Sequence, residues 1–197
     1  MVALGMSQIC NRLCKMIKSL YQRLLIKRAR VLVIGLEHTG KSSFIPLIFN
    51  DTFEDNQGPS SVEIKRYAFS GITFVVYDIP GGRDSIAKWD HYYKKADLLI
   101  FFVNSAAQEE ELAKSRDELK NLLYRNMWLK KSILILGNKN DLDGSISCKD
   151  IILKLDLLSI VDREVACYSV SGKKNINTDL VRDWLVEQTG YLSNRRY

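Results

Sequence analysis

The sequence predicts an α/β protein whose mainly parallel six-stranded sheet has one antiparallel edge strand and carries helices on both faces. Short apolar runs alternate with amphipathic segments along the chain, which is typical of strands and helices that succeed each other in a parallel sheet. Two of the apolar runs are separated only by Ser70-Gly71, which predicts a β-hairpin. Because 46% of the 197 residues are hydrophobic, the chain can bury one good core, and we expect one folded domain.

The charge of the chain is unevenly distributed. The net charge is +6, yet residues 1–30 contain seven lysines and arginines and no acidic residue, so the rest carries −1. We therefore expect no nucleic-acid-binding face on the domain itself. The longest apolar runs, such as residues 98–103, are too short to span a bilayer. The four cysteines show no disulfide or zinc spacing and suit a reducing compartment.

Residues 2–28 predict a basic amphipathic helix, with apolar residues at spacings of three and four and basic residues between them. From Arg12 onward a charge interrupts the apolar core that a cleavable signal peptide needs. Three interpretations stay open: a helix in an anionic membrane interface, a helix packed on the domain or a partner, and disorder. Cys10 and Cys14 lie one turn apart, as in an acylation site or as two small hydrophobic residues on one face. Val2 excludes N-myristoylation at this start site.

The remaining elements follow in order. Pro46 is compatible with the first helix of the domain because it lies in the opening turns. Residues 50–61 are rich in Asp, Asn, Gly and Pro and predict a mobile loop, and Ser147 with Asp150 predicts a capping box. Strands are expected at residues 31–34, 62–69, 72–77, 98–103, 133–136 and 165–170, and helices at 42–49, around 89–93, at 109–127, from 147 and at 180–188. We expect the N-terminal helix over residues 1–29, the domain over 30–190 and a tail over 191–197.

A glycine-rich motif follows the first predicted strand. Residues 35–42 read Gly-Leu-Glu-His-Thr-Gly-Lys-Ser, which fits the phosphate-loop pattern of Gly, four residues, Gly, Lys and Ser or Thr. The glycines allow a concave loop whose N–H groups point at phosphate oxygens, and the following helix adds the positive end of its dipole. We expect Lys41 to reach the β and γ phosphates and the Ser42 hydroxyl to bind Mg²⁺. The other residues expected around the phosphates are Glu37, His38, Thr39, Gly40 and Ser43.

A second motif, Asn138-Lys139-Asn140-Asp141, directly follows another buried strand and therefore belongs to the same edge of the sheet. The Asp141 carboxylate can accept both the ring N–H and the exocyclic amino group of guanine, whereas adenine offers an acceptor and a differently placed donor. A wrong base leaves the carboxylate unpaired, which can cost several kcal/mol. Alone this tetrapeptide is an ordinary surface turn, but after a strand and a phosphate loop it predicts guanine recognition.

With these two motifs the chain resembles the Arf-like branch of the Ras superfamily of small GTPases from Val31 to about Leu185. The aromatic segment 89–93 and residues 183–185 also look like family segments, and a basic amphipathic N-terminal helix is a family trait. The resemblance implies a P-loop small-GTPase fold that binds GTP or GDP with Mg²⁺. It also implies that the loop at residues 169–172, including Ser169 and Val170, packs against the guanine base.

By the same resemblance, residues 50–61 and 78–93 are switch regions that bind effector, exchange and activating proteins. The resemblance further implies a cytoplasmic protein that is peripheral on intracellular membranes and acts in intracellular or vesicle trafficking. The expected membrane contact is an anionic surface bound through residues 2–28.

The chain departs from the family pattern in both switch regions. Switch I of the family carries Pro-Thr, where this chain has Pro59 and Ser60, so a hydroxyl that can contact Mg²⁺ and the γ-phosphate is kept. In switch II, Asp78 keeps the role of supporting the Mg²⁺ site from outside the coordination sphere, and Gly81 keeps the N–H that meets the γ-phosphate. Gly82 replaces the glutamine that orients the attacking water.

Two neighbouring residues, His38 and Arg83, are candidates to replace that glutamine. His38 and Arg83 carry polar groups near the expected site, but His38 fits equally a loop residue that faces solvent, so no catalytic residue is assigned. Pro80 fixes its own φ and lacks a backbone donor, so we expect the start of switch II to move less than in the family. Glu37, where the family has Asp, is a conservative replacement.

Two functional hypotheses follow from these residues. The first is a guanine-nucleotide-binding molecular switch at membranes whose intrinsic GTP hydrolysis is slow because of Gly82. The second is a membrane adaptor that binds GTP without hydrolysing it. A more distant alternative, a P-loop ATPase or nucleotide kinase, is disfavoured by Asp141 and by the absence of a lid-like arginine cluster.

Overall fold

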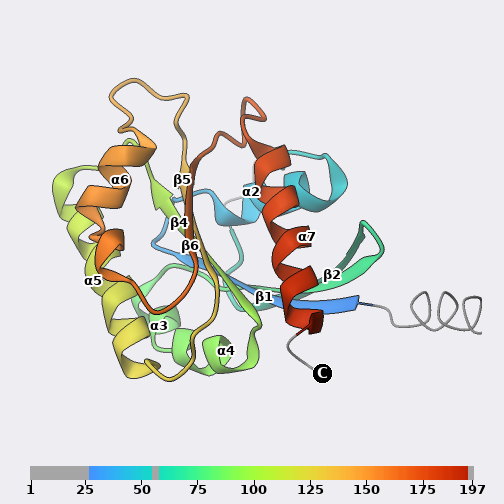
Figure 1. The fold of residues 1–197 in the computed structure, drawn as a ribbon. Coiled ribbons are helices and arrows are strands. Elements are labelled where there is room, and N and C mark those ends of the chain that lie inside the picture. The colour runs from blue at the N-terminus through green and yellow to red at the C-terminus, as the bar shows by residue number, and fades with distance from the viewer. Residues whose placement is uncertain (1–26, 55–57, 195–197) are drawn as a thin grey trace, which may run out of the picture.

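The computed structural model describes residues 27–54 and 58–194, so most of the predicted N-terminal helix and the last three residues lie outside the described part. The described residues form a six-stranded sheet with the strand order β2-β3-β1-β4-β5-β6 and with helices on both faces (Figure 1). Strand β2 pairs with β3 in the antiparallel direction, and the other neighbouring strands run parallel. The predicted fold class is therefore confirmed. The strands are β1 (Lys27–Gly35), β2 (Glu63–Phe69), β3 (Ile72–Asp78), β4 (Leu98–Asn104), β5 (Ile133–Asn138) and β6 (Val165–Ser169).

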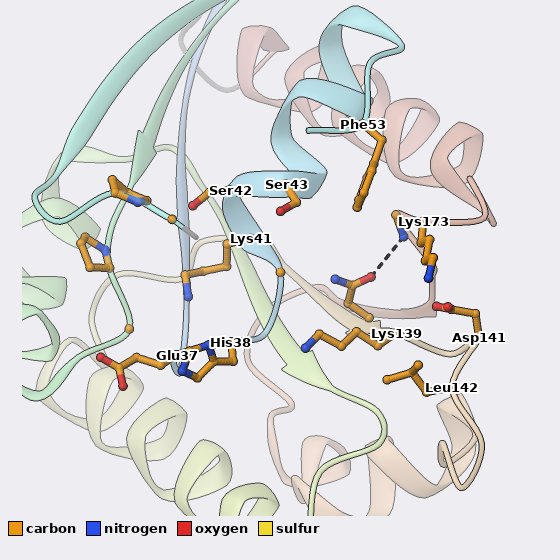
Figure 2. Close-up of a pocket in the computed structure, with 17 residues that line it drawn as sticks. Glu37, His38, Lys41, Ser42, Ser43, Phe53, Lys139, Asp141, Leu142 and Lys173 are labelled. Carbon is orange, nitrogen blue, oxygen red and sulfur yellow. Dashed lines mark hydrogen bonds between the residues drawn. The ribbon is translucent and has the colours of Figure 1, made fainter. Parts of the chain in front are cut away.

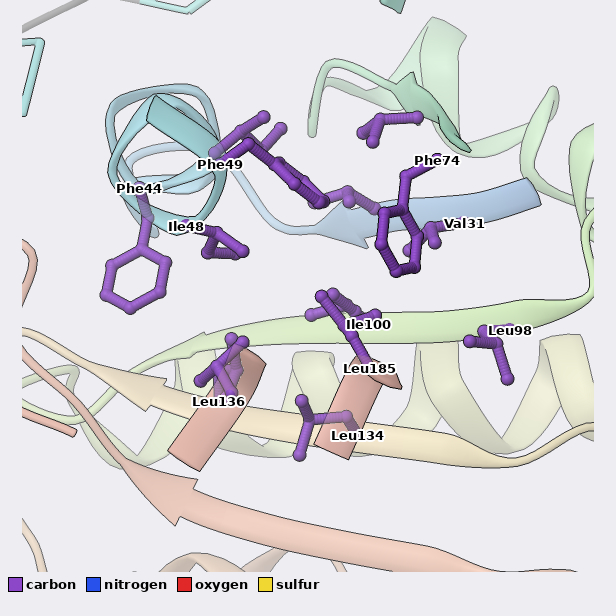
Figure 3. Close-up of a cluster of buried hydrophobic side chains, with 14 of the residues drawn as sticks. Val31, Phe44, Ile48, Phe49, Phe74, Leu98, Ile100, Leu134, Leu136 and Leu185 are labelled. Atoms are coloured by element: carbon purple, nitrogen blue, oxygen red, sulfur yellow. The ribbon is translucent and has the colours of Figure 1, made fainter. Parts of the chain in front are cut away.

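Two hydrophobic layers, one on each face of the sheet, hold the helices in place. Successive strand residues point to opposite faces, so Val31 joins one layer and Leu32 the other. In the first layer Phe44 of α2 (Lys41–Asn50) and Leu185 of α7 (Thr178–Asn194) pack on the sheet (Figure 3), and in the second layer Trp89 of α4 (Trp89–Lys95) packs against Phe101 of β4. The helices are α2 (Lys41–Asn50), α3 (Arg83–Ile86), α4 (Trp89–Lys95), α5 (Glu109–Arg125), α6 (Cys148–Lys154) and α7 (Thr178–Asn194), with a 3₁₀ turn η1 (Leu157–Ser159).

Two local sequence predictions are confirmed. Helix α2 contains Pro46 as its sixth residue and continues to Asn50, so the proline is accommodated although it lacks the N–H that would donate to the Ser42 carbonyl oxygen. At the start of α6 the Asp150 backbone N–H donates to the Ser147 hydroxyl over 3.2 Å, and the Asp150 carboxylate accepts from the Ser147 backbone N–H over 3.2 Å. This is the predicted capping box.

The ends of the domain differ from the prediction. Strand β1 begins at Lys27, so Lys27 and Arg28 pair with Ile72 and Thr73 of β3 instead of continuing a helix. The reason is that β3 offers a full row of backbone partners, and strand pairing outweighs the helical spacing of the sequence. The last helix also extends to Asn194, beyond the predicted boundary at residue 190. Within the described residues, we find no helix that combines the length and hydropathy required to cross a membrane.

Candidate functional site

A cavity of about 680 Å³ opens at the edge of the sheet where the parallel strands end (Figure 2). Ten of the predicted binding residues line it: Glu37, His38, Gly40, Lys41, Ser42, Ser43, Gly81, Asn138, Lys139 and Asp141. Seven further residues line it: Phe53, Gly58, Pro59, Pro80, Leu142, Gly172 and Lys173. The two motifs, about a hundred residues apart in sequence, therefore meet around one space, as their positions after parallel strands predict.

The phosphate loop joins β1 to α2 through two residues with positive φ. His38 has a φ of 56° and Gly40, the N-cap residue of α2, has a φ of 81°. A side chain at position 40 would start 2.4 Å from the Asn138 amide nitrogen, so a glycine is required there for conformation and for space. Helix α2 shows no side-chain capping bond at its start, which leaves its N-terminus suited to an anionic ligand.

Lys41 extends into the enclosed side of this loop. Its side chain is 5% exposed, and its Nζ donates to the carbonyl oxygens of Gly35 at 2.9 Å and Leu36 at 2.8 Å. Burial lowers the pKa of Lys41 to about 8, and the nearby carboxylates of Asp78 and Glu37 oppose that shift. A buried ammonium group at a glycine-rich turn is a strong binding element for a polyphosphate.

Asp78 lies behind the phosphate loop at the end of β3. It is 4% exposed, and burial raises its pKa while a hydrogen bond with Ser42 and the charge of Lys41 oppose the rise. Among the described residues its Oδ1 atom has no hydrogen-bond partner. A buried carboxylate oxygen without a partner, next to a hydroxyl that lines the cavity, fits the support of a hydrated Mg²⁺. Ser60, the third predicted metal residue, is exposed and does not line the cavity.

Asn138 connects the two ends of the cavity. Its amide nitrogen donates to the Thr39 carbonyl oxygen over 2.8 Å, and its amide oxygen accepts from the Gly172 N–H over 3.3 Å, which is the dashed line in Figure 2. Thr39 itself is fully buried, and its hydroxyl donates to the Leu36 carbonyl oxygen over 2.9 Å. Thr39 therefore shapes the loop from inside and does not line the cavity.

Asp141 lies at the opposite end of the cavity from Glu37. The Ser171 hydroxyl donates to its Oδ1 atom over 2.6 Å, and this bond lowers the pKa of Asp141. Figure 2 shows the Lys139 side chain extending along the cavity between the phosphate loop and Asp141. Lys139 has a φ of 65°, a conformation unusual for a residue with a side chain. The arrangement places an ionised acceptor in the wall of the same cavity that the phosphate loop lines.

The loop after β6 approaches the cavity two residues later than predicted. Ser169 is the last residue of β6, and Val170 is fully buried and bonds to Gly137 and Asn140 through its backbone. Neither residue lines the cavity, whereas Gly172 and Lys173 do. Gly172 lies within the predicted loop of residues 169–172, but backbone bonds hold Val170 inside the fold, so the contact with the cavity begins only at Gly172.

The Phe53 side chain forms part of the cavity wall, a position that the sequence did not predict. Its ring is 43% exposed and lies against Gly172, where an added Cβ would be 2.9 Å from Phe53 Cε2. Phe53 also lies near Phe44 of α2. No fixed spacing predicts this contact, because it depends on how the loop after α2 folds back over the loop after β6.

The two switch II glycines, Gly81 and Gly82, differ in whether a side chain would fit at their positions. A Cβ on Gly81 would be 2.2 Å from the Leu36 carbonyl carbon and 2.3 Å from the Glu37 nitrogen, so the backbone of the phosphate loop excludes any side chain there. Gly82 has φ −70° and ψ 160°, a conformation open to any residue, and its added Cβ would meet only the Glu37 carboxylate at 2.7 Å. Arg83 is exposed and does not line the cavity, whereas His38 does.

Comparison with known proteins shows the family and the fold of the chain. A sequence model of the ADP-ribosylation factor family matches residues 13–189. ADP-ribosylation factor-like protein 8c of Arabidopsis thaliana is 30% identical over 158 residues, which cover 80% of this chain and 85% of the relative.

Two solved structures share the fold. The Arl6 BBS3 small GTPase of Trypanosoma brucei with bound GppNp aligns with a TM-score of 0.76 and 20% identity over 83% of this chain and 98% of that chain. The structure of the mammalian SRP receptor aligns with a TM-score of 0.73 and 24% identity over 81% and 99%.

Proposed function

Because the chain belongs to the ADP-ribosylation factor family of small GTPases, we propose that it is a GTP-binding molecular switch with slow intrinsic hydrolysis. The observation that carries the proposal is the single cavity with buried Lys41 at one end and ionised Asp141 at the other. The Lys41 ammonium group matches the negative charge of the phosphates, and the Asp141 carboxylate matches the hydrogen-bond donors of guanine.

In the nucleotide complex, each residue acts through a contact that its position supports. Lys41 binds the β and γ phosphates and the N-terminus of α2 binds the phosphate oxygens, while Asp141, aligned by Ser171, accepts from the guanine edge. The residues that would hold Mg²⁺ are Ser42 directly and Asp78 from behind, and the metal neutralises charge on the β and γ phosphates when bound. Ser60 lies outside the cavity lining, so it joins them only if its position changes when nucleotide binds.

Slow hydrolysis follows from the residue at position 82. The glutamine that orients the attacking water in Ras-type proteins is absent, because Gly82 has no side chain. We expect an intrinsic rate constant below the ~10⁻⁴ s⁻¹ scale of Ras. The triphosphate form then persists until an activating protein supplies the missing group or the nucleotide exchanges.

The test is a single-turnover assay on the full chain loaded with GTP in the presence of Mg²⁺. We expect GTP to compete with bound nucleotide far better than ATP, and loaded GTP to decay over hours. A rate at or above that of Ras would contradict slow hydrolysis, and equal affinities for GTP and ATP would contradict the guanine assignment. Complete absence of turnover would instead establish the non-hydrolysing adaptor.

The membrane part of the proposal depends on residues 2–28, where the basic charge of the chain is concentrated. Because β1 begins at Lys27, the deletion that leaves the domain whole removes residues 1–26. We expect full-length protein to bind vesicles that contain phosphatidylserine and the deletion variant to lose at least ~10-fold in binding, since each basic residue near such a surface contributes about 1 kcal/mol. Equal binding of both proteins would contradict a membrane anchor in this segment.

The proposed setting of this switch is the cytoplasmic surface of intracellular membranes, with a role in trafficking. Effector, exchange and activating proteins would contact residues 50–61 and 78–93, the segments on either side of the phosphate end of the cavity. The support for this is the position of Pro59 and Gly81 in the cavity wall, where a γ-phosphate changes the contacts of both segments.

A further inference from the structure

The Glu37 side chain occupies the space beside Gly82. A Cβ added to Gly82 would lie 2.7 Å from Glu37 Oε1, and the next nearest atom, Glu37 Cδ, would be 3.8 Å away. The Glu37 carboxylate therefore stands where a side chain at position 82 would begin. The backbone conformation of Gly82 is open to any residue. The space for a side chain at position 82 is therefore limited by the Glu37 carboxylate and not by backbone strain.

The surroundings of Glu37 place its carboxylate at the phosphate end of the cavity. Glu37 lines the cavity together with Lys41 and Gly81, and its charge is close enough to affect the pKa of Lys41. The N–H of Glu37 also belongs to the loop segment against which Gly81 packs. Figure 2 shows the Glu37 side chain directed away from Asp141 and toward the switch II segment.

We infer that the Glu37 carboxylate orients the attacking water in the residual GTP hydrolysis of this protein, in place of the absent side chain at position 82. This inference rests on the proposed function. A carboxylate oxygen accepts a hydrogen bond from water as the amide oxygen of a glutamine does, and it can hold the water oxygen toward the γ-phosphorus.

In this step the water oxygen forms a bond to the γ-phosphorus, and the bond from phosphorus to the β–γ bridging oxygen breaks. GDP leaves with that electron pair, and the proton lost by the water passes to the inorganic phosphate formed. Glu37 holds the water and keeps no proton at the end. The carboxylate also brings a negative charge close to the γ-phosphate, which weakens binding of the triphosphate and agrees with a slow step.

The test compares single-turnover GTP hydrolysis in wild type, Glu37→Ala, Glu37→Gln and the double variant Glu37→Ala/Gly82→Gln. Glu110→Ala is the matched control, because Glu110 is an exposed glutamate of α5 that does not line the cavity and lies outside both switch regions. We expect Glu37→Ala to slow hydrolysis ~10-fold or more, since a group that positions a water contributes on this scale or above. Glu37→Gln keeps an acceptor oxygen and should stay within ~3-fold of wild type, and the double variant should recover at least the wild-type rate.

A second readout does not depend on turnover. In Glu37→Ala the affinity for GppNp should rise several-fold relative to the affinity for GDP, because the repulsion of the γ-phosphate is removed. Equal rates in Glu37→Ala, Glu110→Ala and wild type would overturn the inference, and so would a wild-type protein that binds GTP without any turnover. A protein that binds no GTP would overturn the proposed function itself, so the two failures are distinguishable.

Discussion

The two ends of the cavity are built differently. At the base end, Asn138, Asp141 and Ser171 are tied to neighbouring segments by hydrogen bonds of 2.6 to 3.3 Å. At the switch end, Glu37 is exposed, and the Glu37 carboxylate is the group that a side chain added at Gly82 would meet. The base end therefore has its ligand contacts formed in advance, whereas the switch end depends on the exposed side chain of Glu37.

This difference separates binding from hydrolysis. Groups held by a packed network lose little entropy when a ligand arrives, so the base end favours tight and selective binding. Hydrolysis requires a water held within a few tenths of an ångström, and a single exposed carboxylate holds it less well than a packed group. We expect mutations at the base end to change affinity and selectivity, and mutations at the switch end to change rate.

The largest expected effect is that of removing Lys41, the side chain that binds the phosphates of both GDP and GTP. Lys41→Ala should weaken GDP and GTP binding by about 4 kcal/mol, roughly 1,000-fold, because a buried charge partner of the phosphates is lost. Titration with a fluorescent guanine nucleotide measures this. Lys114→Ala, an exposed lysine of α5 outside the cavity, is the control and should bind as wild type does.

The next largest effect tests the base end. Asp141→Ala should lose about 3 kcal/mol of guanine affinity and with it the preference for GTP over ATP, since the donors of guanine are left without an acceptor. Competition between GTP and ATP gives the preference directly. Asp143→Ala removes an exposed acid of the same loop that does not line the cavity, and a similar loss in that variant would show that loop charge alone is responsible.

Ser171→Ala should have an intermediate effect on the same preference. The Ser171 hydroxyl aligns Asp141 through the 2.6 Å hydrogen bond, and loss of such a bond to a charged group costs about 1 to 2 kcal/mol. We expect guanine affinity to fall ~10-fold while phosphate binding is kept, as inorganic pyrophosphate competition would show. An unchanged GTP to ATP ratio would mean that Asp141 needs no alignment and that the base end is less ordered than its contacts indicate.

The smallest effect concerns stability and has opposite signs with and without ligand. Asp78 is a buried acid whose raised pKa shows that its charge is unfavourable in the nucleotide-free protein. Asp78→Asn should therefore stabilise the nucleotide-free protein by about 1 kcal/mol, or ~3 °C in Tm, and reduce the stabilisation that GDP with Mg²⁺ gives. Thermal unfolding with EDTA and with GDP and Mg²⁺ measures both, and a lower Tm in EDTA would contradict the unfavourable charge.

Sequence reasoning predicted the parts of the site that depend on fixed spacing. Lys41 and Asp141 each follow a buried strand within a short motif, and parallel strands bring such positions to one edge regardless of the loops between them. Phe53 and Lys173 were missed because their approach to the cavity depends on the path of two loops. The carboxylate of Glu37 was read as a conservative replacement, since its contact with position 82 exists only in three dimensions.

The same limit applies to the fold. Buried strands with continuous apolar residues and the Ser70-Gly71 turn were predictable, because local pattern and final structure agree there. The beginning of β1 was not, since Lys27 and Arg28 continue a helical pattern and extend only because β3 pairs with them. Sequence pattern alone does not include the partner strand.

The most direct test of a selective base end combined with a slow switch end is the nucleotide carried by the protein as purified. Release by denaturation and separation by chromatography identify and count it, and incubation with Mg²⁺ before release shows how fast it turns over. We predict guanine nucleotide at close to one equivalent, with loaded GTP still present after hours. Adenine nucleotide in the purified protein, or GTP converted to GDP within minutes without a partner, would contradict the account.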